Sequence, residues 1–126
     1  MSKPGKTGIA RVIDAFGYSM KGLAAAWRFE AAFRQEVSLA IIMIPAAFWL
    51  ATNHIELILL ISSVFWVLMA ELANSSVEAV VDRTGHERHE LSGRAKDIGS
   101  ALVFTSLILL GIVWGVIAVN RFHGAF

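Results

Sequence analysis

MAELANSSVEAVVDR, residues 69–83, carries three carboxylates into an otherwise apolar part of the sequence. Residues 57–70 are all uncharged. Glu71 follows directly, and Glu78 and Asp82 lie seven and eleven residues after it. At about 100° per residue, these offsets return each side chain to within about 20° of the same helical direction. The three acids therefore form one stripe on a helix, and an acidic stripe that is kept in a membrane helix is typical of a functional site.

The composition is that of a membrane protein. Of the 126 residues, 56% are hydrophobic and 17% are charged. Three segments with few or no charges are each near the roughly 20 residues that cross the hydrocarbon core. We therefore expect an all-α membrane protein that forms a single domain over residues 1–126. Its transmembrane helices are expected at about residues 30–52, 56–83 and 92–120.

Residues 8–27 are predicted to form an amphipathic helix on the membrane surface. Their apolar side chains recur at spacings of three and four, opposite Arg11, Asp14, Tyr18 and Lys21. The segment is too polar to span, so it is expected to lie along the interface. A helix packed on a soluble core is the weaker interpretation, because the three spans leave no soluble domain to pack against.

The distribution of basic residues predicts the orientation. Ten of the eleven Lys and Arg residues precede the first span or lie between the second and third: Lys3, Lys6, Arg11, Lys21, Arg28, Arg34, Arg83, Arg88, Arg94 and Lys96. By the positive-inside rule, the N-terminus and the connection at residues 83–97 are cytoplasmic. The acidic stripe then opens toward the cytoplasm, where nucleotides are. A net charge of +1 gives no case for a nucleic-acid partner.

The stripe suggests phosphoryl transfer. Two of its carboxylates, with Glu30 from the preceding helix, can offer oxygen ligands to a hard divalent cation. Lys96 and Arg11 can then neutralise phosphates, which completes the set of metal, cationic clamp and positioned base. This pattern predicts a membrane-embedded phosphotransferase that acts on a lipid hydroxyl. A small proton-coupled transporter and a structural subunit without activity stay open as alternatives, since a buried acidic stripe also suits transport.

Four stretches carry a family resemblance: AAWRFEAAFRQE at residues 25–36, LISSV at 60–64, ELANSSVEAVVDR at 71–83 and HELSGRAKDIGSA at 89–101. They resemble the bacterial integral-membrane diacylglycerol kinases, with specific ExxNxxxExxxD and GRAKD signatures. The resemblance implies a homotrimer whose active sites are shared between neighbouring subunits, with three spanning helices and one surface helix per subunit. It also implies transfer of the ATP γ-phosphate to diacylglycerol at the bacterial inner membrane. Undecaprenol kinase is the alternative within this chemistry.

The same resemblance implies roles for individual residues. Glu71 would be the general base, supported by Asn74, while Glu30 and Glu78 would hold the magnesium ion of Mg-ATP. The nucleotide would be bound by Arg11, Tyr18, Glu30, Glu78, Glu87, Arg88, His89, Lys96 and Asp97. The lipid would be bound by Arg11, Ser19, Trp27, Phe33, Gln35, Glu36, Glu71 and Ser100.

Two segments indicate less about function. His86 and His89 in HERHE lack the HExxH spacing, so the spacing favours a solvated loop over a metal site. The resemblance instead implies nucleotide contacts for Glu87 and His89. Phe16 and Met20 depart from the family pattern, which implies a smaller residue and an aromatic residue at these positions.

Overall fold

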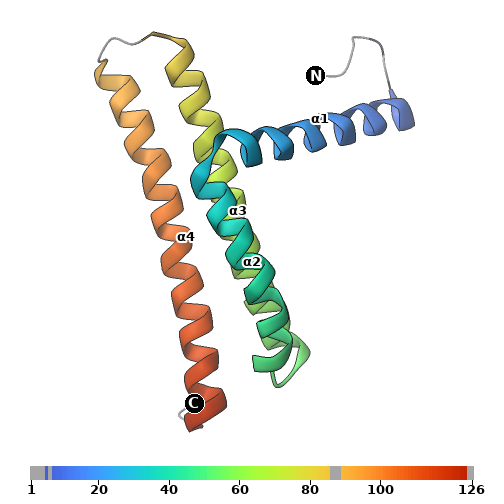
Figure 1. Cartoon of the computed structure of the whole chain (residues 1–126), viewed down its shortest axis with the longest axis vertical. Helices are drawn as coiled ribbons and strands as arrows, with labels where there is room; N and C mark the ends of the chain where they lie inside the picture. Colours follow the sequence, from blue (N-terminus) through green and yellow to red (C-terminus); the bar gives the residue numbers. More distant parts are fainter. Residues whose placement is uncertain (1–4, 6, 86–88, 125–126) are drawn as a thin grey trace.

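The computed structural model describes residue 5, residues 7–85 and residues 89–124, and these contain helices and no strand. The helices are α1 (Gly8–Phe29), α2 (Ala31–Leu50), α3 (His54–Arg83) and α4 (Glu90–His123). The last three are long and apolar enough to cross a membrane. Figure 1 shows α1 leaving these three helices at a large angle. The predicted all-α fold, with one separate N-terminal helix and three spans, is confirmed.

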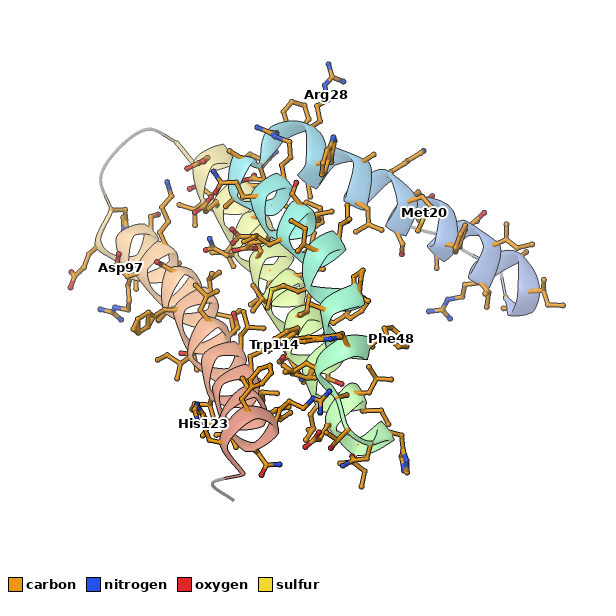
Figure 2. All side chains as sticks on the ribbon, turned by 60° about the horizontal axis from the view of Figure 1, so that its bottom comes forward. Met20, Arg28, Phe48, Asp97, Trp114 and His123 are labelled. Atoms are coloured by element: carbon orange, nitrogen blue, oxygen red, sulfur yellow. The ribbon has the colours of Figure 1, made fainter. Side chains whose placement is uncertain are left out.

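The central helix of the three spans is α3, which packs along both α2 and α4. A buried apolar core lies far from the α3–α4 connection and is formed by Ala47, Leu50, Leu60 and Ile117. Beside this core, the indole N–H of Trp114 on α4 donates to the carbonyl oxygen of Leu60 at 3.2 Å and to Ser63 Oγ at 3.1 Å. Figure 2 shows Trp114 within the helix bundle. These bonds help fix how α4 lies against α3, because few polar partners compete for them in an apolar setting.

Much of the apolar surface of the spans is not covered within one chain. Phe104 is 61% exposed and Ile112 is 57% exposed, both on α4. Within the most apolar stretch of this helix, only 11% of the residues are buried inside the chain. Lipid tails or further protein chains must cover such a surface, because exposure of this much apolar area to water is unfavourable.

A single residue separates α1 from α2. Glu30 has φ −115° and ψ 103°, which breaks the helix and redirects the chain. Arg34 fastens this break, since its Nη1 donates to the carbonyl oxygens of Trp27 at 2.7 Å and Arg28 at 3.1 Å. The last carbonyls of a helix have no partner within that helix, so the guanidinium supplies the missing donors. The corner therefore holds Glu30 at the start of α2.

Capping side chains fix the starts of α3 and α4. At α3, Asn53 Oδ1 accepts from the N–H of Glu56 at 2.9 Å. Glu56 Oε1 in turn accepts from the N–H and the hydroxyl of Thr52, at 2.9 and 2.7 Å. At α4, His89 Nδ1 accepts from the N–H of Leu91 at 3.1 Å. His89 thus caps the helix that carries Lys96.

Candidate active site

Burial changes steadily along the acidic stripe of α3. Glu71 is only 5% exposed. Asn74 and Glu78 are half-buried, and Asp82 is exposed. A carboxyl group as buried as that of Glu71 is costly in a spanning helix, which favours a functional reason for its presence. The stripe leads from a buried acid to an exposed one at the end of α3.

Three further carboxylates lie near Glu71. Glu78 on the same helix and Glu30 at the α1–α2 break both interact electrostatically with Glu71. Glu36 on α2 also interacts with Glu71. One oxygen of Glu36 is buried and finds no hydrogen-bond partner among the described residues. Because these like charges repel one another, the cluster favours the binding of a proton or a cation.

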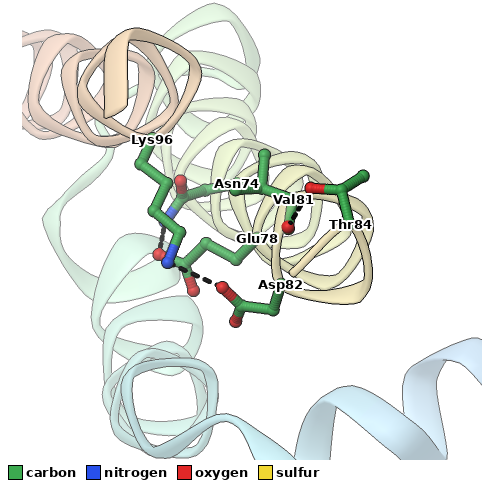
Figure 3. Close-up of polar contacts among 6 residues, drawn as sticks. All are labelled: Asn74, Glu78, Val81, Asp82, Thr84 and Lys96. Carbon is green, nitrogen blue, oxygen red and sulfur yellow. Dashed lines mark hydrogen bonds and ion pairs between the residues drawn. The ribbon is translucent and has the colours of Figure 1, made fainter. Parts of the chain in front are cut away.

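Asn74 and Lys96 connect the stripe to its surroundings, as Figure 3 shows. The amide of Asn74 donates to Glu78 Oε1 at 3.3 Å. From α4, the ammonium of Lys96 forms an ion pair with Asp82 Oδ1 at 2.7 Å, and it also interacts with the charge of Glu78. The Lys96 and Asp82 side chains are 45% and 64% exposed. Such an exposed pair is weak in water, so a phosphate group can take the place of Asp82.

A groove of about 680 Å³ lies between α1 and α3 and reaches Glu30. Its walls are mainly apolar or small side chains, with hydroxyl groups from Ser19, Ser75 and Ser76. Of the predicted lipid contacts, Ser19 lines this groove, and its hydroxyl donates to the carbonyl oxygen of Ala15 at 2.9 Å. An apolar groove that ends at a carboxylate suits an amphiphilic molecule.

Two predicted nucleotide contacts lie along α1, away from its junction with α2 at Glu30. Arg11 and Tyr18 precede Glu30 by 19 and 12 residues, which corresponds to about 28 and 18 Å along a helix. Figure 1 shows this part of α1 pointing away from α3 and α4. The ammonium of Lys21 instead lies 5.8 Å from the ring centre of Tyr18.

The remaining predicted residues lie in several places. Phe33 is buried, whereas Trp27 and Gln35 are exposed near the α1–α2 corner. Asp97 and Ser100 are exposed on α4, and Figure 2 labels Asp97 near the start of this helix. Glu87 and Arg88, with His86, lie outside the described residues. One chain therefore brings together Glu30, Glu36, Glu71, Asn74 and Glu78, with Lys96 close by.

Arg34 and Gly99 are not among the residues that the sequence predicts for the site. In the sequence, Arg34 is an ordinary charged residue at the end of an apolar span. Its position in the sequence does not indicate that it binds the carbonyls of the preceding helix. Gly99 is buried against Asn74, where a Cβ would lie 3.3 Å from Cγ of Asn74 and even closer to its Oδ1. An isolated glycine inside a helical pattern is a sequence signal for such a close approach.

Known proteins resemble this chain over most of its length. The family model of prokaryotic diacylglycerol kinase matches residues 17–118. A diacylglycerol kinase of Haemophilus influenzae is 57% identical over 109 residues, which cover 86% of this chain and 92% of that protein. One of Escherichia coli K12 is 52% identical over 116 residues, covering 92% and 95%. One of Pseudomonas aeruginosa is 47% identical over 113 residues, covering 90% and 92%. These matches confirm the resemblance of the four stretches, and the chain belongs to the prokaryotic diacylglycerol kinase family.

Proposed function

We propose that this protein is a lipid kinase that transfers the γ-phosphate of ATP to the hydroxyl of diacylglycerol and so produces phosphatidic acid. Its family membership supports this activity, as does the name shared by its relatives. The observation that carries the proposal is the position of Glu71, a buried carboxyl in a spanning helix. Further carboxylates surround it, and Lys96 lies further along the same stripe. A lipid hydroxyl and a polar nucleotide can meet only at such a boundary.

Glu71 is the general base in this proposal. It lies 17 residues after the start of α3, which corresponds to about 26 Å along the helix. In a hydrocarbon core of roughly 30 Å, this depth is just below the headgroups. The Glu71 carboxylate takes the proton of the lipid hydroxyl. The hydroxyl oxygen attacks the γ-phosphorus of ATP at the same time, and ADP leaves. Asn74 supports this step by holding Glu78 beside Glu71.

Glu30 and Glu78 would hold the magnesium ion of Mg-ATP. Mg²⁺ commonly binds one or two carboxylates together with substrate phosphates, so this pair is a suitable donor set. In the described part of the chain, no three His, Asp or Glu side chains form a metal site by themselves. The phosphates of ATP would therefore have to complete the coordination. When bound, the ion would supply neutralisation of phosphate charge.

The nucleotide would reach the site from the end of α3 at which Asp82 lies. Lys96 would exchange Asp82 for a phosphate oxygen, and Asp97, with residues 87–89, would contact the rest of ATP. Arg11 lies about 28 Å along α1 from Glu30, and this separation supports composite sites in a homotrimer. The basic residues support a cytoplasmic N-terminus in the bacterial inner membrane.

Transfer of radioactive phosphate from ATP in mixed micelles tests the proposal. We expect phosphatidic acid from diacylglycerol, at a higher rate than the product from undecaprenol. Faster transfer to undecaprenol would favour the polyprenol kinase alternative. The absence of any lipid-dependent ATP consumption would favour transport, because transport needs a sealed membrane and micelles have none.

Replacing Glu71 with glutamine tests the role of the base. Glu71→Gln should abolish transfer while the protein stays folded, because the amide keeps the shape of the side chain but cannot accept the proton. Glu90→Gln is the matched control, since Glu90 is an exposed acid at the start of α4. Near-normal turnover by Glu71→Gln would contradict the assignment.

A further inference from the structure

We propose that Gly99 is a positioning residue that sets the side chain of Asn74 and, through it, that of Glu78. This inference rests on the lipid kinase reaction proposed above. Gly99 lies on α4 and is buried where this helix packs on α3. It touches no substrate in this proposal. Its contribution is the space that it leaves for Asn74.

The space left by Gly99 is filled by the amide of Asn74. A Cβ built on Gly99 would lie 3.3 Å from Cγ of Asn74 and closer than van der Waals contact to Oδ1. Real side chains essentially never approach a Cβ so closely, so any residue other than glycine must displace the amide. The Asn74 side chain therefore occupies the place that a Cβ at position 99 would take.

Glu78 decides which way the amide points. An ionised carboxylate only accepts hydrogen bonds, so the NH₂ group of Asn74 must face Glu78, and Nδ2 donates to Oε1 at 3.3 Å. Oδ1 then faces Gly99, and it is buried without a hydrogen-bond partner among the residues that the structure describes. The amide is thus held between a carboxylate on one side and the bare backbone of α4 on the other. A methyl group on the second side would push it away from the first.

The backbones of the two helices would not have to move apart. The Cβ position of Gly99 lies 3.8 Å from Cα of Asn74, which is ordinary van der Waals contact. An alanine at position 99 therefore conflicts with the end of a side chain and not with the packing of α3 on α4. We expect the variant to fold while Asn74 and Glu78 lose their arrangement.

Gly99 differs in this respect from the other glycines of α4. A Cβ added to Gly93, Gly111 or Gly115 would meet nothing within 4 Å. Alanine in a helix interior is more favourable than glycine, so these positions would accept it without cost in this chain. Gly93→Ala is therefore a matched control in the same helix, six residues before Gly99.

A double-mutant cycle tests the inference, with Mg-ATP kinetics measured in mixed micelles. Gly99→Ala should lower kcat/KM for Mg-ATP about 10- to 100-fold, the range expected for loss of a hydrogen bond to a charged group. Gly93→Ala should stay within about twofold of the unchanged protein. In an Asn74→Ala background, Gly99→Ala should cost less than about twofold, because the displaced group is already gone. Equal losses in both backgrounds would overturn the proposal, and so would full activity of Gly99→Ala.

A structural readout keeps the inference separate from the reaction. The NH₂ resonance of Asn74 in NMR spectra, assigned by its loss in Asn74→Ala, should shift in Gly99→Ala and not in Gly93→Ala. If the unchanged protein transfers no phosphate, the proposed function fails, but an unshifted resonance in Gly99→Ala is still required to overturn the role of Gly99. If Gly99→Ala does not fold, Asn74→Ala/Gly99→Ala should restore folding. Failure of that double variant would show a backbone conflict and also overturn the proposal.

Discussion

Replacing Arg34 with methionine should weaken the corner between α1 and α2. Methionine keeps an unbranched apolar stem, so it preserves packing of the side chain, but it cannot donate hydrogen bonds. The carbonyl oxygens of Trp27 and Arg28 then lose their donors at 2.7 and 3.1 Å. Glu30 lies within this corner, so its carboxylate becomes less well held beside Glu71.

The expected loss in the free energy of unfolding is about 1 to 3 kcal/mol. A typical net hydrogen bond contributes about 0.5–1.5 kcal/mol, and two bonds are lost. The larger range for charged donors does not apply, because water can replace the guanidinium at the exposed carbonyls. Unfolding in detergent micelles by titration with dodecyl sulfate measures the change. In the phosphate-transfer assay, Arg34→Met should also need more Mg²⁺ for half-maximal rate, because Glu30 is a proposed ligand.

Arg28→Met is the matched control for this experiment. Arg28 carries the same charge at the same corner, and its guanidinium carbon lies 5.3 Å from the ring centre of Phe29. Removing this side chain leaves both hydrogen bonds of Arg34 in place. If Arg34→Met lowers the free energy of unfolding no more than Arg28→Met does, the corner does not depend on Arg34 and the reasoning is refuted.

Two further predictions separate the nucleotide end of the bundle from its core. Lys96→Met should raise the Mg-ATP concentration for half-maximal rate about 10- to 100-fold, because a charged contact to phosphate is lost. Arg94→Met, which removes only an exposed pair with Glu90 at 3.6 Å, should change it little, and equal effects would contradict the role of Lys96. Trp114→Phe should lower the free energy of unfolding by about 0.5–1.5 kcal/mol, because the bonds of the indole N–H are lost. The KM for Mg-ATP should stay the same, and a changed KM would mean that this packing reaches the site.

Local patterns in the sequence were sufficient for the architecture. Charge-free length predicts a spanning helix because the bilayer has a fixed thickness, and a spacing of seven and eleven residues predicts a shared face because the helix has a fixed pitch. The gradient from buried Glu71 to exposed Asp82 follows from the same two quantities. The four stretches at residues 25–36, 60–64, 71–83 and 89–101 were enough to predict the family.

Contacts between helices could not be read from these patterns. The break at Glu30 depends on Arg34, whose partners lie six and seven residues away on another helix. Likewise, the ion pair between Lys96 and Asp82 depends on how α4 is aligned along α3. Hydropathy and periodicity describe one helix at a time, so they do not predict how two helices align.

The sequence by itself determined that this protein has three spans, a surface helix and an acidic stripe, because hydrophobicity and helical pitch act within each segment. Only the tertiary structure decided that Gly99 leaves room for Asn74 and that Arg34 holds the α1–α2 corner at Glu30. The physical reason is that these arrangements depend on side-chain packing between helices, which no pattern within one segment describes. At Gly99, a Cβ would take the place that the amide of Asn74 occupies.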